Sequence, residues 1–152
     1  MSRKRRFIPD DIRGPATAEG LISTQSGEFH YTIRLRDCDR IRCLFDSFEI
    51  RPSNGERFSV EPFHLQKRLL YMEGGLVVTE AGGPEKRTVL RSATPWVVGT
   101  KIAFFEIVVD PAAGITVEQV LYDRVTGERR REPSAMSRDT LERLAADLTD
   151  LL

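Results

Sequence analysis

Hydrophobic residues recur at three- and four-residue steps over the last part of the chain, residues 137–152. This spacing is typical of an amphipathic helix, because it gathers apolar side chains on one stripe. Ser137 is a suitable N-cap, and Asp139 favours the positive end of the helix dipole. The sequence therefore predicts a C-terminal helix whose apolar stripe must pack on its own sheet or on a partner. That stripe contains Leu141, Leu144, Leu148 and Leu151.

Before this helix, apolar and polar residues alternate with a period of two. The alternation is clearest over residues 29–35, which indicates a β-strand with one apolar and one solvated face. The apolar residues that follow keep one phase up to Phe45, but Phe48 and Ile50 lie on the opposite phase. A bulge near residues 46–47 would bring both sets onto one face of the sheet.

Further strands are separated by segments rich in Gly, Pro and Asp. Residues 102–109 are apolar on both faces, which is typical of a central strand. Turn signals at intervals of about 8–12 residues are expected of an all-β sandwich or barrel. Short strands are also expected around residues 58–63 and over 69–72. We therefore predict a mainly β (α+β) fold: an antiparallel β-barrel or bent β-sandwich of about seven or eight strands, with the C-terminal helix packed on it.

Length and composition indicate one folded domain. Of the 152 residues, 40% are hydrophobic and 30% are charged, as in ordinary globular proteins. Residues 1–19 are basic and contain Pro and Gly, so we expect a flexible arm followed by a single domain over 20–152. With no apolar run long enough for a membrane span and no secretory signal, we expect a small soluble cytoplasmic protein. In that compartment Cys38 and Cys43 are expected to be free thiols.

Charge offers a nucleic-acid hypothesis but does not favour it. The 23 basic residues are balanced by 23 acidic ones, so no overall field attracts a polyanion. Arginine nevertheless clusters in the N-terminal arm and in two hairpins, where it could contact phosphates or other anions. Acidic residues lie within the same clusters. The candidate contacts are Arg3, Lys4, Arg5, Arg6, Arg34, Arg36, Arg129, Arg130 and Arg131.

Catalytic and metal-binding patterns are weak. His30 and His64 are the only histidines, and neither lies in a recognisable catalytic motif. A Cys–His nucleophile would require the fold to bring distant residues together. Cys38 and Cys43 have no second Cys or His pair with which to form a zinc site. We therefore expect no enzyme activity, no metal and no cofactor.

Two short stretches carry a resemblance to a known family. Gly55-Glu56 with residues 60–63, and then Leu70-Tyr71-Met72 before Gly74, are similar to the start of WYL-type regulatory domains. The resemblance implies a small ligand-sensing β-barrel. Leu-Tyr-Met stands where the family has Trp-Tyr-Leu, and no functional residue is transferred.

These observations favour a non-catalytic binding or adaptor module that acts through protein–protein interaction. Its candidate partner-binding residues are Leu141, Leu144, Leu148 and Leu151, provided that the helix does not bury them against its own sheet. A second copy of the chain is one such partner, because the helix could dock on it. The alternatives are a barrel that binds a small apolar ligand and a nucleic-acid-binding barrel.

Overall fold

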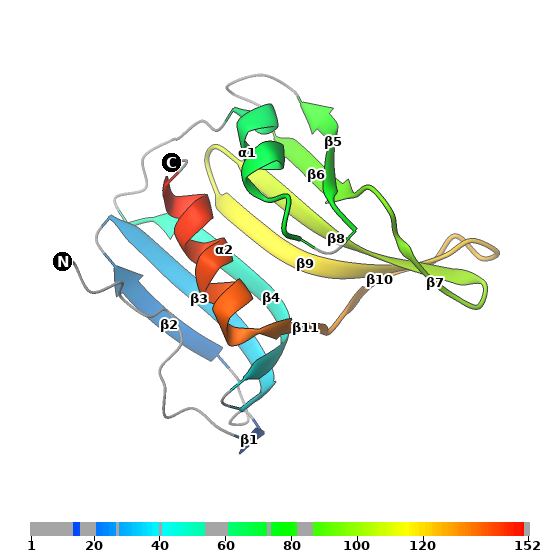
Figure 1. Cartoon of the computed structure of the whole chain (residues 1–152), viewed down its shortest axis with the longest axis horizontal. Helices are drawn as coiled ribbons and strands as arrows, with labels where there is room; N and C mark the ends of the chain where they lie inside the picture. Colours follow the sequence, from blue (N-terminus) through cyan, green and yellow to red (C-terminus); the bar gives the residue numbers. More distant parts are fainter. Residues whose placement is uncertain are drawn as a thin grey trace.

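The computed structural model describes residues 14–15, 21–26, 28–39, 41–53, 61–72, 74–81 and 87–150. Within these residues, eleven strands form one antiparallel sheet, and two helices lie against it (Figure 1). The strands are β1 (Gly14–Pro15), β2 (Leu21–Ser26), β3 (Phe29–Cys38), β4 (Arg42–Pro52), β5 (Leu76–Ala81), β6 (Thr88–Ser92), β7 (Trp96–Val98), β8 (Lys101–Asp110), β9 (Gly114–Asp123), β10 (Arg129–Glu132) and β11 (Ser134–Ser137). The helices are α1 (Pro62–Arg68) and α2 (Arg138–Asp150).

The sheet bends strongly but does not close. Its main path runs β3-β4-β9-β8-β6-β5, with β1 and β2 both pairing with β3. The central strands β4 and β9 pair over only three residues each. Beyond that stretch β10 pairs with β9, and β11 pairs with β4. The consecutive strands β10 and β11 therefore lie between β9 and β4 where these two no longer pair. The antiparallel, mainly β prediction is confirmed. The barrel prediction is wrong, because the path ends at β5, which pairs with β6 alone within the described residues.

The strand count exceeds the predicted seven or eight because several strands are short. Strands β1, β7, β10 and β11 have two to four residues each. The last of these short strands, β11, leads directly into α2. Ser137 Oγ accepts a hydrogen bond from the Thr140 amide at 3.1 Å, which confirms the predicted N-cap.

The predicted bulge in β4 is present. The β3–β4 register shifts twice, on either side of the pair Leu35–Phe45, so that Arg36 and Asp46 have no opposite residue in the ladder. These two side chains instead pair with each other, with Arg36 Nε 2.6 Å from Asp46 Oδ1. The shift turns Phe45 and Phe48 to the same face, where both are fully buried.

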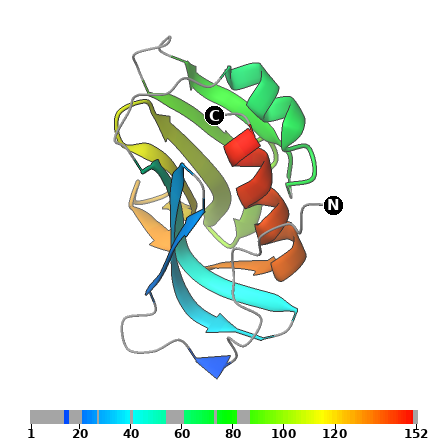
Figure 2. The ribbon, with the colours of Figure 1, turned by 90° about the vertical axis from the view of Figure 1, so that its left-hand side faces the viewer.

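Both helices cover the same face of the sheet (Figures 1 and 2). The inner stripe of α2 and two leucines around α1 enter one core with side chains of β3, β4, β8 and β9. The predicted packing of the C-terminal helix on the sheet is therefore confirmed. The buried leucines are Leu65, Leu69, Leu141, Leu144 and Leu148.

Helix α1 corrects the expectation of strands around residues 58–63 and over 69–72. Pro62 occupies the first turn of α1, and the Glu61 side chain accepts a hydrogen bond from the His64 amide at 2.6 Å. Proline interrupts a strand but suits the first turn of a helix, where its missing amide is not needed. The residues after α1 form turns rather than a strand, and residues 54–60 lie outside the described part of the chain.

Candidate interaction surfaces

Four of the five predicted anion-binding arginines that the structure describes are paired with carboxylates. Arg36 pairs with Asp46 at 2.6 Å, and Arg129 pairs with Glu106 at the same distance. Arg130 lies 3.3 Å from Glu132, and Arg131 lies 2.7 Å from Glu118. Arg34 is exposed on β3, while the four basic residues at positions 3–6 lie outside the described residues. These ion pairs reduce the positive charge that the sequence places in the hairpins.

Glu106 is the centre of a polar cluster on the sheet that includes two arginines. Its side chain projects from β8 on the face opposite the core, where one carboxylate oxygen lies 2.7 Å from Arg91 Nε and the other 2.6 Å from Arg129 Nη2. Both guanidinium groups also lie over the Phe104 ring, 5.6 and 5.8 Å from its centroid. The cluster thus links β6, β8 and β10 and covers an apolar ring.

Glu106 is ionised over a wide pH range. Burial alone would raise the pKa of its carboxyl group, but hydrogen bonds from Arg129 and Arg91 hold this pKa below the ordinary value. A carboxylate with a lowered folded-state pKa stabilises the fold above the unfolded-state pKa, which is about 4.3 for glutamate. That stabilisation is lost as the pH falls through the folded-state pKa.

Replacing Glu106 by Gln is therefore expected to lower the free energy of unfolding at pH 7 by about 1–3 kcal/mol. The difference between the wild type and the variant should shrink as the pH falls below about 4.3. Urea titrations at several pH values measure both quantities.

The Glu132→Gln variant is the matched control, because its partner Arg130 is exposed and such pairs contribute little. A pH-independent difference for Glu106→Gln would show that Glu106 stabilises the fold through shape rather than charge.

A second polar cluster joins the two helices. Asp147 of α2 accepts hydrogen bonds from Arg68 Nε at 3.0 Å and from the Tyr71 hydroxyl at 2.8 Å. The guanidinium of Arg143 lies 3.9 Å from the centroid of the Tyr71 ring. Burial, followed by the hydrogen bond to Asp147, raises the pKa of Tyr71 well above its ordinary value. This cluster fixes the outer edge of α2 against the segment that follows α1.

The leucine stripe of α2 is used inside the molecule. Leu141, Leu144 and Leu148 are each 0% exposed and belong to the core. A partner could reach them only if the helix left the sheet. Leu151 lies outside the described residues. The structure thus places the three described residues of the predicted partner-binding stripe away from the surface.

Among the described residues, three exposed valines lie at one end of the sheet. Val97, Val98 and Val125 are 68%, 57% and 77% exposed. The first two belong to β7 and the third to the turn between β9 and β10. Figure 1 shows the β7–β8 and β9–β10 turns at the same end of the sheet, which we call the hairpin tip (residues 96–101 and 123–128).

The two turns of the hairpin tip are held together by hydrogen bonds. The Arg124 amide donates to the Thr100 carbonyl at 3.2 Å, and its guanidinium reaches the Thr100 and Gly99 carbonyls at 3.3 and 3.4 Å. Asp123 Oδ1 accepts from the amides of Val125 and Thr126 at 2.9 and 3.3 Å. The exposed valines therefore belong to turns whose backbone is held by hydrogen bonds.

The sequence patterns considered above do not indicate this surface. Two signals point to it. Consecutive apolar residues in a strand project to opposite faces, so one of Val97 and Val98 must turn away from the core face. Val125 is an apolar residue in a turn that is otherwise polar.

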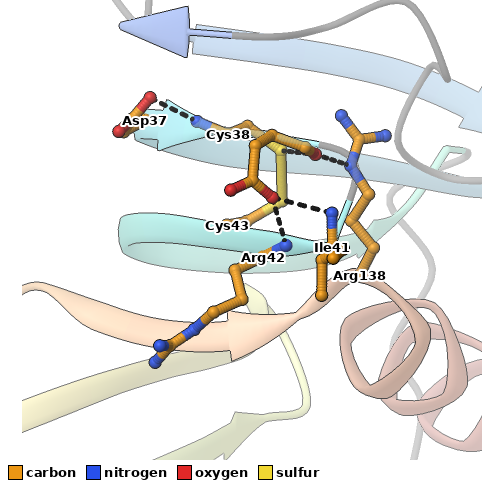
Figure 3. The surroundings of a disulfide bond; sticks show 7 residues. Asp37, Cys38, Ile41, Arg42, Cys43 and Arg138 are labelled. Carbon is orange, nitrogen blue, oxygen red and sulfur yellow. Dashed lines mark hydrogen bonds between the residues drawn. A yellow bond between two sulfur atoms is a disulfide. The ribbon is translucent and has the colours of Figure 1, made fainter.

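A disulfide joins Cys38 to Cys43, which corrects the expectation of free thiols (Figure 3). The two cysteines are opposite each other in the β3–β4 ladder, with their Cα atoms 4.2 Å apart. The tight turn between Cys38 and Cys43 brings the two residues together, and their proximity cannot be inferred from the amino-acid composition. With both sulfurs bonded, neither cysteine offers a thiolate for nucleophilic catalysis.

The histidines are not placed for catalysis with a cysteine. A hydrogen bond of 2.7 Å joins His30 Nε2 to Ser23 Oγ, at the end of β3 far from Cys38. His64 is exposed on α1. No group of three or more His, Cys, Asp or Glu that could hold a metal occurs among the described residues. Over the same residues, no helix is long and apolar enough to cross a membrane.

Comparison of the chain with protein-family models, with curated proteins and with solved structures found no match.

Proposed function

We propose that this protein is a non-catalytic binding module and that a partner protein contacts its hairpin tip. The observation that supports this proposal is the exposure of Val97, Val98 and Val125 on turns that are themselves hydrogen-bonded to each other. Exposed apolar side chains favour association, because burying a valine is worth about 1.5–3 kcal/mol.

An ordered tip also lowers the cost of binding. The hydrogen bonds of Arg124 and Asp123 hold the two turns before any partner arrives, so little conformational entropy is lost on association. The partner should therefore offer a shallow apolar pocket, into which one or two of the valines fit.

The two alternative functions have less support. A small apolar ligand needs an interior cavity, whereas the sheet is open and its inner face is packed by side chains of α1 and α2. Nucleic acid needs arginines that are free to bind phosphate, whereas Arg36, Arg129, Arg130 and Arg131 each pair with a carboxylate.

A photo-crosslinking residue at position 98, introduced in cells that make the protein, tests the proposal. We expect a covalent adduct with a partner, which mass spectrometry identifies. Purified partner should then bind the double variant Val98→Lys, Val125→Lys at least about tenfold more weakly than the wild type, because two buried valines are lost. An adduct of twice the chain mass would identify a second copy as the partner.

Val77 provides the matched control, since it is an exposed valine on β5, outside the hairpin tip. A crosslinker at position 77 should give no specific adduct, and Val77→Lys should leave binding unchanged. Equal binding by the wild type and the tip variant, with both folded by circular dichroism, would overturn the proposal.

A further inference from the structure

The disulfide between Cys38 and Cys43 lies where the last helix begins. Cys43 is paired in the sheet with Cys38 of β3 on one side and with Met136 of β11 on the other. Strand β11 leads directly into α2. The disulfide therefore holds the end of the β3–β4 hairpin next to β11, the strand that precedes α2.

The residues between the two cysteines provide the acceptors for the first residue of α2. The Arg138 amide donates to the Ile41 carbonyl at 2.7 Å. The Arg138 guanidinium nitrogen Nε donates to the Asp39 carbonyl. Figure 3 shows the Arg138 side chain lying against the turn that the disulfide closes. Both contacts depend on the position of two carbonyl groups that the disulfide constrains.

The turn has a second support that does not depend on the disulfide. Asp39 Oδ1 accepts hydrogen bonds from the amides of Ile41 and Arg42, both at 2.7 Å, and the Asp39 amide donates to the Arg42 carbonyl at 2.9 Å. This network resembles an Asx turn, which forms from local sequence alone. The hairpin should therefore persist when the sulfurs are reduced, so that reduction changes its geometry without abolishing it.

We propose that the Cys38–Cys43 disulfide is a redox-sensitive latch that controls how firmly the start of α2 is attached to the sheet. A dithiol reductant donates two electrons and two protons, the S–S bond breaks, two thiols form, and the reductant becomes a disulfide. Without the S–S bond, no covalent link holds the ends of β3 and β4 at a fixed separation, and the two thiols can move apart. The Asp39 and Ile41 carbonyls then move relative to Arg138, and the first turn of α2 loosens.

The coupling acts in both directions. Cys38 and Cys43 are only 2% and 1% exposed, so a reductant reaches the sulfurs only after a local opening, and release of β11, which pairs with Cys43, from β4 would provide one. Whatever favours the lifted state therefore favours reduction, and reduction favours the lifted state, because coupling between two equilibria is reciprocal. This inference concerns the hairpin at Cys38–Cys43 and does not depend on the function proposed for the hairpin tip.

Amide hydrogen exchange of the full-length wild type, oxidised with glutathione disulfide or reduced with dithiothreitol, tests the latch. Alkylation in denaturant followed by mass measurement counts the thiols, with none expected after oxidation and two after reduction. We expect exchange of the Arg138 amide and of the β11 amides to be at least about fivefold faster in the reduced protein. Amides of the paired strands β8 and β9 should exchange at unchanged rates.

The double variant Cys38→Ala, Cys43→Ala is the control, because alanine suits the apolar site and cannot respond to the reductant. Its exchange should be the same with and without dithiothreitol. The inference is overturned if wild-type exchange around Arg138 is equal in the two states. It is also overturned if two thiols remain after oxidation, or if exchange in β8 and β9 accelerates as much as at Arg138.

Discussion

Replacing Leu144 by Asp is expected to unfold the protein. Leu144 is 0% exposed, lies on the inner stripe of α2 and belongs to the same core as residues of the sheet and of α1. Truncation of such a leucine to alanine costs about 2–5 kcal/mol, and a carboxylate adds the cost of burying a charge without a partner. Small domains have a total stability of about 5–15 kcal/mol, so the loss is comparable to the whole.

Circular dichroism and urea titration measure this effect. The control is Ala146→Asp, which places the same side chain on the exposed side of α2 and should change the free energy of unfolding by at most about 1 kcal/mol. If Leu144→Asp were folded with an unchanged unfolding midpoint, the stripe of α2 would not be part of the core. The helix would then be free to serve a partner.

Replacing Gly114 by Ala should destabilise the protein by about 2–5 kcal/mol. Gly114 begins β9 with a φ of +128°, a conformation that other residues rarely adopt. A β-carbon there would lie 2.4 Å from the Ile50 carbonyl oxygen and 2.9 Å from Arg51 Cγ. Because the first of these atoms is backbone, β4 and β9 would have to move apart where they pair.

The Gly127→Ala variant separates the two causes of this effect. Gly127 also has a positive φ, +74°, but nothing lies within 4 Å of an added β-carbon. The Gly127→Ala substitution should lower the free energy of unfolding by only about 1–2 kcal/mol, through backbone strain. Thermal and urea unfolding of both variants give the comparison. Equal losses would mean that the close approach of β4 to β9 contributes nothing to the effect.

The fold elements that the sequence predicts well are those set by local periodicity. The helix over residues 137–152 and its Ser137 cap depend on neighbours a few residues apart. The bulge near Asp46 was visible because a change of phase along one strand must be corrected within that strand. The sequence does not predict helix α1, because its seven residues are too few for a clear period and because a proline is found at strand ends as well as in the first turn of a helix.

Closure of the sheet was not predictable in the same way. It depends on how far β4 and β9 stay paired, and these strands are separated by more than sixty residues in the chain. The exposure of Val97 and Val125 depends on whether other parts of the fold pack over them. The disulfide depends on the turn that sets Cys38 opposite Cys43. Each of these features depends on how residues from different strands lie relative to each other, which the sequence around each residue does not indicate.

A mainly β chain that ends in an amphipathic helix can be predicted from the sequence, because strand and helix periods are properties of short segments. That the sheet stays open, and that Leu141, Leu144 and Leu148 are buried against the chain's own sheet, is known only from the folded structure. The same is true of the carboxylates that pair with Arg36, Arg129 and Arg131. The physical reason is that burial and charge pairing depend on what lies across the fold, and sequence distance carries little information about that.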